Sequence, residues 1–166
     1  MIKAILACDD NYGVGKNGSI PWPVNKSDML FFKEKTSENV VVMGSSTWND
    51  PKMPKPLPNR INVVATTQDP SMFENADGIL KNDLRLATLR LQDMYTELDV
   101  YVIGGSNIVE QTLPIIEEFY ISRIPGDYDC DTFLPLMKIE TLFERAEVEE
   151  HEDVTFEIWR KREAVS

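Results

Sequence analysis

The chain has 166 residues, 42% of them hydrophobic, which is enough to bury the core of one globular domain, so we expect a single domain over residues 1–166. Its formal net charge is −11, and this acidic balance argues against nucleic acid as a partner, because neutralising phosphates requires a basic surface. No apolar run approaches the roughly 20 residues of a membrane-spanning helix, and the short apolar start of the chain stops at Asp9, unlike a signal peptide, so we expect a cytoplasmic protein that does not bind membranes.

Short apolar segments alternate with segments of helical periodicity along the chain. The pattern predicts strands at 2–8, 40–43, 61–66, 100–103, 119–124 and 155–161, and helices at 27–36, 84–95 and 107–113. Asn25 or Ser27 can cap the first helix, the proline-rich stretch 51–58 is expected to be a rigid surface loop, and 155–161 alternates as an outer or antiparallel strand does. The order favours an α/β fold with a mostly parallel sheet covered on both faces, in which ligands bind beyond the carboxyl ends of the strands.

Residues 13–22 (GVGKNGSIPW) directly follow the first predicted strand. Three glycines and a proline indicate an irregular, adaptable loop. Ile20 and Trp22 are large apolar side chains that could close over a flat ligand. A surface loop whose apolar tip packs into the core would have the same composition, so this segment alone supports both interpretations.

Asp28 stands in the first turn of the first predicted helix. A carboxylate at that position complements the helix dipole, which is a sufficient structural reason for it. Phe31 and Phe32 lie three and four residues further on and share its face, so the carboxyl group would be partly desolvated and its pKa raised. The residue is therefore equally consistent with a helix cap and with a functional acid.

Two turns between a buried strand and a helix contain glycine, one at Gly44 and one at Gly104-Gly105. Such turns can bring backbone amides close to a phosphate. The second turn lacks the third glycine of the Rossmann fingerprint, so close packing between two backbones explains it equally well.

Only two cysteines, Cys8 and Cys130, and one histidine, His151, are present. They lack the number and spacing of a zinc site, so we expect no bound metal and two reduced thiols.

Taken together, these segments resemble dihydrofolate reductase along nearly the whole chain. The family's glycine-rich loop, which ends in Pro-Trp and precedes an acid at the start of a helix, is similar to the stretch from Gly15 to Asp28. Phe32 and Lys33 follow the acid as in the family. Four further motifs occur in the family order, namely Met43-Gly44-x-x-Thr47-Trp48, Pro56-Leu57-Pro58-Asn59-Arg60, Ile103-Gly104-Gly105 and Asp131-Thr132-Phe133-Leu134-Pro135.

The resemblance implies an eight-stranded, mostly parallel central sheet with an antiparallel C-terminal strand and about four flanking helices. It implies an enzyme that reduces dihydrofolate with NADPH, with Asp28, Ile20 and Trp22 at the reaction site. We expect a monomer, because no stretch of the sequence reads as an exposed apolar seam. For the substrate, the resemblance implies that Asp28 binds the pterin, that the backbone carbonyls of Ile5 and Ile103 face it, and that Ala7 lies nearby. It implies that Phe32 stacks on the rings and that Arg60 pairs with the carboxylate of the glutamate tail. Ser122 would support the carboxyl group of Asp28. Around the cofactor it implies Ala7, Ile20, Gly44, Ser45, Ser46, Thr47, Thr66, Thr67, Lys81, Gly104, Gly105, Ser106, Asn107 and Ile108.

Three positions depart from the family pattern. Ser45 and Asn107 stand where the family usually has cations that bind the cofactor's phosphates, and Val109 replaces a common tyrosine. Thr66, Thr67 and Lys81 could compensate in part, so NADPH remains the expected cofactor. Two alternatives stay open, a pyrimidine reductase of riboflavin synthesis and a catalytically silent relative that serves as a binding or structural module.

Overall fold

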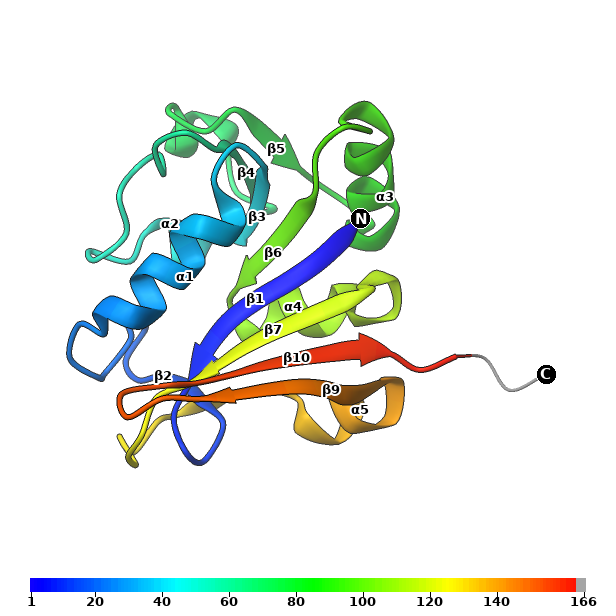
Figure 1. Ribbon diagram of the computed structural model, residues 1–166. Helices are drawn as coiled ribbons and strands as arrows, with labels where there is room; N and C mark the ends of the chain where they lie inside the picture. The colour runs from blue at the N-terminus through cyan, green and yellow to red at the C-terminus, as the bar shows by residue number, and fades with distance from the viewer. Residues whose placement is uncertain (164–166) are drawn as a thin grey trace.

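The computed structural model describes residues 1–163, and an eight-stranded sheet runs through the middle of the molecule (Figure 1). The strand order is β5-β4-β3-β6-β1-β7-β10-β9, and β10 runs antiparallel to both of its neighbours, β7 and β9. The strands are β1 (Ile2–Cys8), β3 (Val40–Gly44), β4 (Ile61–Ala65), β5 (Gly78–Leu80), β6 (Val100–Gly104), β7 (Glu118–Arg123), β9 (Phe143–Glu150) and β10 (Thr155–Lys161). A separate antiparallel pair joins β2 (Gly13–Gly15) to β8 (Thr132–Phe133).

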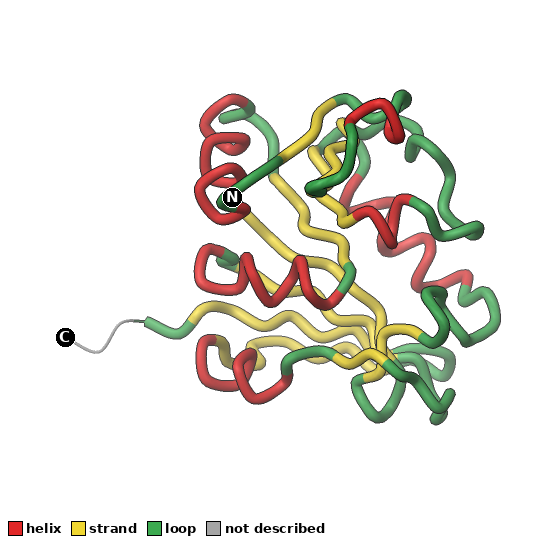
Figure 2. Tube along the Cα trace, turned by 180° about the vertical axis from the view of Figure 1, so that it is seen from behind, coloured by secondary structure: helices red, strands yellow, loops and turns green. Residues whose placement is uncertain are grey.

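Helices cover both faces of the sheet. α3 (Leu84–Met94), α4 (Ser106–Thr112) and α5 (Leu136–Leu142) share one core with alternate residues of the central strands, and lie along the same face in the view from behind (Figure 2). α1 (Lys26–Thr36), α2 (Ser45–Trp48) and the 3-10 turn η1 (Pro70–Phe73) supply aromatic side chains to a second core on the other face. A second 3-10 turn, η2 (Leu113–Ile115), ends α4. Side chains at successive strand positions point to opposite faces, which explains the two cores.

The architecture agrees with the expected α/β class, including the antiparallel C-terminal strand. The predicted strands and helices are present, with ends that differ by at most two residues. Asn25 is the observed cap of α1, because its side-chain oxygen accepts from the Asp28 amide at 2.9 Å. The described residues contain five α-helices where about four were expected, since α5 adds one and α2 is a single turn. Strands β5 and β9 were not predicted, and β10 lies inside the sheet, next to β9, instead of at its edge.

Strand β10 carries a fully buried carboxylate at Glu157. One of its oxygens accepts from the Trp159 indole at 3.0 Å and the other from Arg145 at 3.2 Å. Arg123 Nε lies 3.1 Å from that second oxygen as an ion pair. The paired cations explain why an acid is tolerated in the core at this position.

Within residues 1–163, none of the helices combines the length and the apolar character that a bilayer crossing requires.

Candidate functional site

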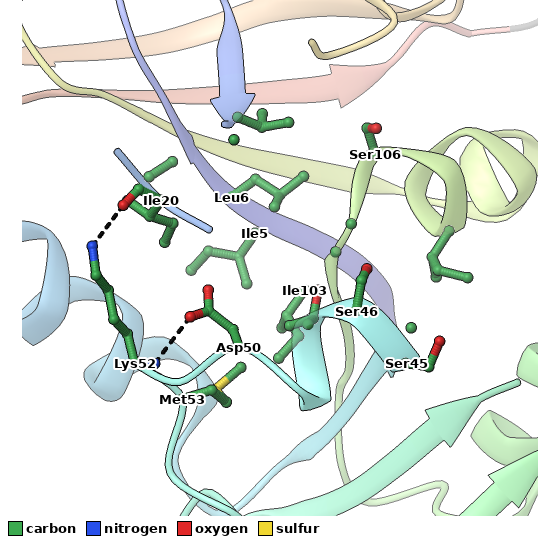
Figure 3. Close-up of a pocket in the computed structure, with 18 of the residues that line it drawn as sticks. Ile5, Leu6, Ile20, Ser45, Ser46, Asp50, Lys52, Met53, Ile103 and Ser106 are labelled. Carbon is green, nitrogen blue, oxygen red and sulfur yellow. Dashed lines mark hydrogen bonds between the residues drawn. The ribbon is translucent and has the colours of Figure 1, made fainter. Parts of the chain in front are cut away.

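A cleft of about 1210 Å³ opens at the carboxyl ends of the central strands. Residues that end or follow β1, β3, β4, β5 and β6 form its floor, as is typical of ligand sites in parallel sheets. Figure 3 shows part of this cleft, with Ile5 and Leu6 of β1 and Ile103 of β6 among the residues that line it. The cleft therefore gathers side chains from segments that lie far apart in the sequence.

Nearly all the site residues predicted from the sequence line this cleft. They are Ile5, Ala7, Ile20, Trp22, Asp28, Phe32, Gly44, Ser45, Ser46, Thr47, Arg60, Thr66, Thr67, Lys81, Ile103, Gly104, Gly105, Ser106, Asn107 and Ile108. Ser122 does not line it. This serine is buried on β7 and pairs with Ala7 in the β1–β7 register, so it lies next to the cleft wall.

The Asp28 carboxyl group is partly buried in the cleft. Its main-chain amide is capped by Asn25, so the carboxyl group of Asp28 itself is not needed to cap the helix. Desolvation raises the pKa of Asp28 above its ordinary value, and the neighbouring Ser122 side chain offsets part of that rise. The Ser122 hydroxyl makes no hydrogen bond of regular geometry within the described chain, so its contact with Asp28 is a weak polar one. A partly desolvated acid in a ligand-sized cleft has the character of a functional group.

Arg60 and Phe32 lie together at another part of the cleft. The guanidinium group is held by the Pro58 carbonyl, 2.8 Å from Nε, and by the Thr36 hydroxyl, 3.1 Å from Nη1. Its central carbon is 5.8 Å from the centroid of the Phe32 ring. Partial burial lowers the pKa of Arg60, but a guanidinium group remains charged at neutral pH. Arg60 makes no ion pair within the described part of the chain, so its charge is available to an anionic ligand.

The glycine-rich loop (residues 13–22) is anchored to Asp131 by two hydrogen bonds. The Asn17 amide donates to Asp131 Oδ2 at 2.8 Å, and the Asp131 amide donates to the Gly15 carbonyl at 2.9 Å. Trp22 is 4% exposed and makes an edge contact with Tyr128, whereas Ile20 is 38% exposed and lines the cleft. Both earlier interpretations therefore apply, since Trp22 packs into the core and Ile20 faces the cleft.

A second loop closes the opposite side of the cleft. This proline-rich loop (residues 49–60) connects α2 to β4 and brings Asp50, Lys52 and Met53 to the cleft (Figure 3). Lys52 Nζ donates to the Ile20 carbonyl at 2.6 Å, and the Ser19 hydroxyl donates to Asp50 Oδ1 at 3.2 Å. Sequence analysis did not identify Asp50 or Lys52 as site residues, and no local motif marks them.

The glycines of the two turns allow neighbouring side chains to pack closely against the main chain. A side chain at Gly44 would meet Cγ1 of Ile108 at 2.8 Å, so α4 packs directly on the turn after β3. Gly104 has φ +123°, a conformation that side-chain-bearing residues rarely adopt. The small side chains of Ser45, Ser46 and Ser106 line the cleft beside these turns, and all three are labelled in Figure 3.

The far end of the cleft is polar. Thr66 follows β4, and its amide donates to the Leu80 carbonyl at 3.1 Å, so Lys81 lies beside it at the end of β5. Four cationic side chains line the cleft in the described residues, namely Lys33, Lys52, Arg60 and Lys81. Lys81 is the one next to Thr66 and Thr67, which makes this end suitable for a phosphate.

Comparisons with known proteins agree with this architecture. The family model described as dihydrofolate reductase matches residues 1–161. A dihydrofolate reductase of Drosophila melanogaster is 31% identical over 141 residues, covering 79% of this chain and 77% of that protein, and one of Mus musculus is 28% identical, covering 98% of each. A solved structure, a dihydrofolate reductase from Enterococcus faecalis complexed with NADP(H) and RAB-propyl, has a TM-score of 0.79 and 23% identity, covering 98% of this chain and 97% of that one.

Proposed function

Since the chain belongs to the dihydrofolate reductase family, we propose that it reduces 7,8-dihydrofolate to 5,6,7,8-tetrahydrofolate with NADPH. The observation that carries the proposal is that a carboxyl group and a guanidinium group line the same cleft. A desolvated carboxyl group, Asp28, and a guanidinium group without an acidic partner among the described residues, Arg60, lie along one apolar wall with Phe32. Dihydrofolate has the complementary pattern, with hydrogen-bond donors on its pterin and carboxylates on its glutamate tail.

We assign the substrate-binding roles residue by residue. Asp28 would accept from the pterin amino group and the adjacent ring nitrogen. The main-chain carbonyls of Ile5 and Ile103 would face the pterin beside Ala7. Phe32 would stack on the rings, and Arg60 would bind the α-carboxylate through its planar fork. Ser122 would support the Asp28 carboxyl group from β7, next to the cleft.

The residues at the strand ends fit NADPH. The small side chains and exposed main chain at Gly44–Thr47 and Gly104–Ile108 allow the close approach that a dinucleotide needs, and Thr66, Thr67 and Lys81 offer hydroxyl and ammonium donors for a phosphate. When bound, NADPH supplies the hydride from its nicotinamide ring. The protein's part is to hold the two rings at reacting distance and to exclude water, and Ile20 and Trp22 of the glycine-rich loop are suited to this.

Asp28 would also favour the proton transfer that the reaction needs. The imine nitrogen of dihydrofolate is weakly basic, and its protonation makes the neighbouring carbon a better hydride acceptor. A carboxyl group with a raised pKa polarises the bound pterin and favours this protonation, with the proton arriving through water. Such a reaction provides tetrahydrofolate for one-carbon metabolism and thymidylate synthesis. We propose that the whole chain acts as one domain and as a cytoplasmic monomer, and the free thiols of Cys8 and Cys130 are compatible with a reducing compartment.

The test is to mix the protein with NADPH and dihydrofolate and to follow the near-ultraviolet absorbance of the reduced cofactor. We expect a loss of absorbance that requires both substrates. Folded protein that shows no loss with dihydrofolate would contradict the proposal and favour a silent relative. Turnover only with an aminopyrimidine ribose phosphate would favour the pyrimidine reductase.

A further inference from the structure

Two polar contacts join the two sides of the cleft in the structure. Lys52 Nζ reaches across from the proline-rich loop and donates to the Ile20 carbonyl at 2.6 Å (Figure 3). One residue earlier in the glycine-rich loop, the Ser19 hydroxyl donates to Asp50 Oδ1 at 3.2 Å. The two contacts hold consecutive residues of one loop to a single turn of the other.

The turn that holds the loop is itself well defined. Asp50 Oδ1 also accepts from the Lys52 amide at 2.9 Å, and the Asp50 carbonyl accepts from the Met53 amide at 2.9 Å. The Asp50 carboxylate therefore fixes the turn from which the Lys52 side chain extends. Such a turn limits the directions in which Lys52 can point and favours the contact with Ile20.

The partner of Lys52 is a main-chain carbonyl and not an acid. Within residues 1–163, no carboxylate lies within the 4.0 Å of an ion pair with its ammonium group. Because Lys52 binds the main-chain carbonyl of Ile20, the Ile20 side chain is free to line the cleft, where it is found. The contact therefore positions Ile20 without involving its side chain.

An earlier part of the same loop is held by a different group. Asp131 accepts from the Asn17 amide through its side chain, and its own amide donates to the Gly15 carbonyl. Apart from the main-chain bridge between Lys16 and Ser19 within the loop itself, the hydrogen bonds of the described residues attach Ser19 and Ile20 only to the proline-rich loop. Release of Asp50 and Lys52 would therefore free the segment over the cleft while the anchor at Asp131 stays in place.

We propose that Lys52, together with Asp50, is a positioning residue that holds the glycine-rich loop closed across the cleft. Ile20 then covers the reacting rings and excludes water, and ligands leave only after both contacts break. The identity of those ligands rests on the proposed function, whereas the closure itself is a property of the free protein. Both contacts are near the surface, so each changes the ratio of closed to open loop only several-fold, which lets the loop close without trapping the product.

The experiment compares Lys52→Met with Lys52→Arg and with Lys55→Met. Lys55 lies three residues further on in the same loop, is exposed, and makes no side-chain hydrogen bond among the described residues, which makes it a matched control. In ligand-free protein, we expect Lys52→Met to speed amide hydrogen exchange at Lys16 and Ser19, whose amides donate to each other's carbonyls, by about 3- to 10-fold, with exchange in β1 unchanged. Lys52→Arg, which keeps a donor, should restore slow exchange.

A second measurement uses the loaded protein. The rate at which NADPH dissociates should rise by a similar factor of about 3- to 10-fold in Lys52→Met. If amide exchange at Lys16 and Ser19 in the free protein stays at the wild-type rate, or rises equally in Lys55→Met, Lys52 does not hold the loop closed. Because amide exchange needs neither ligand nor turnover, the experiment distinguishes a failure of the proposed role of Lys52 from a failure of the proposed reductase activity.

Discussion

The guanidinium carbon of Arg60 lies 5.8 Å from the centre of the Phe32 ring, so a cation at the end of the proline-rich loop rests over an aromatic side chain of α1. The contact is a cation–π pair, and hydrogen bonds to Pro58 and Thr36 fix the plane of the guanidinium group. The pair presents a flat apolar surface and a two-pronged donor side by side. A ligand with an aromatic ring followed by a carboxylate matches this surface.

Arg60→Lys is expected to raise the KM for dihydrofolate by about 10- to 100-fold with little change in kcat, because an ammonium group cannot form the paired hydrogen bonds of the fork. Steady-state kinetics with varied dihydrofolate measure the effect. Arg90→Lys, at an exposed position of α3, is the matched control and should leave KM unchanged. The KM of a pteridine substrate without the glutamate tail should not change on the Arg60 substitution. An equal rise in KM for both substrates would show that Arg60 does not bind the tail.

Asp28→Asn is expected to lower the hydride-transfer rate near neutral pH by about 10²–10⁴-fold, the usual range for acid–base groups. The amide keeps the shape of the side chain but cannot hold a negative charge against the pterin. Single-turnover measurements from pH 5 to 9 check this, since the substitution should also remove the pH dependence that Asp28 causes. A wild-type rate at every pH would exclude Asp28 from the reaction.

Asp28→Asn is expected to lower activity but to raise the free energy of unfolding near neutral pH. Burial raises the pKa of Asp28 in the folded protein, so the folded state holds its proton to higher pH than the unfolded state does. The free energy of unfolding therefore falls as the pH rises from the ordinary carboxyl pKa through the raised one, and the penalty is complete above the raised pKa. We expect Asp28→Asn to be more stable than wild type at pH 7, with the difference shrinking toward pH 4.

Urea unfolding at several pH values measures that difference. Asp93→Asn, at an exposed position of α3, is the control for the change from a carboxyl group to an amide. A pH-independent gain in Asp28→Asn would show that Asp28 does not titrate differently in the two states.

The strands that are buried in the sheet could be predicted, because burial leaves a pattern of apolar residues in the sequence. The strands without such a pattern could not. The central strand β1 is a run of apolar residues, and its predicted bounds agree with those observed. Strand β9 is exposed at every residue after Phe143, because it is the edge strand, so no alternation of apolar side chains marks it. Strand β5 has only three residues, none of them fully buried. Edge strands are formed by pairing with a neighbour, and the sequence of one segment does not contain that information.

The candidate site shows the same division. Asp28 and Arg60 belong to motifs with fixed spacing, so their presence in one cleft could be predicted. Lys52 and Asp50 lie in a loop between two elements, and their contact with Ile20 and Ser19 depends on how two distant loops meet. Only the tertiary arrangement brings these four residues together, so no spacing rule would have identified them.

Glu157→Gln is expected to lower the free energy of unfolding by about 1–3 kcal/mol. The carboxylate is fully buried and compensates two cations, Arg123 and Arg145, and the amide would leave both without a counter-charge. The effect is smaller than for a fully buried pair because both arginines reach solvent. Chemical denaturation measures it, and Glu150→Gln on the neighbouring strand β9 is the exposed control. Equal stability of the two variants would mean that the cluster contributes nothing to folding.

Ser45→Arg is expected to raise the preference for NADPH over NADH by about 10-fold, measured as the ratio of the two kcat/KM values. Ser45 follows β3 at the cleft, where the family usually has a cation, and a new charge-assisted hydrogen bond to a phosphate has roughly this effect. Lys81→Met should lower the same ratio, because Lys81 is the cation beside Thr66 and Thr67.

Lys26→Met removes an equal charge from the start of α1, outside the cleft lining, and so controls for the overall field of a protein with net charge −11. If Lys26→Met changes the ratio as much as Lys81→Met does, long-range charge sets the preference and Lys81 makes no direct contact with the phosphate. If only the cleft substitutions act, and in opposite directions, then Lys81 replaces the missing cation at position 45. Raising the salt concentration separates the two cases further, because screening weakens a long-range field more than a direct contact.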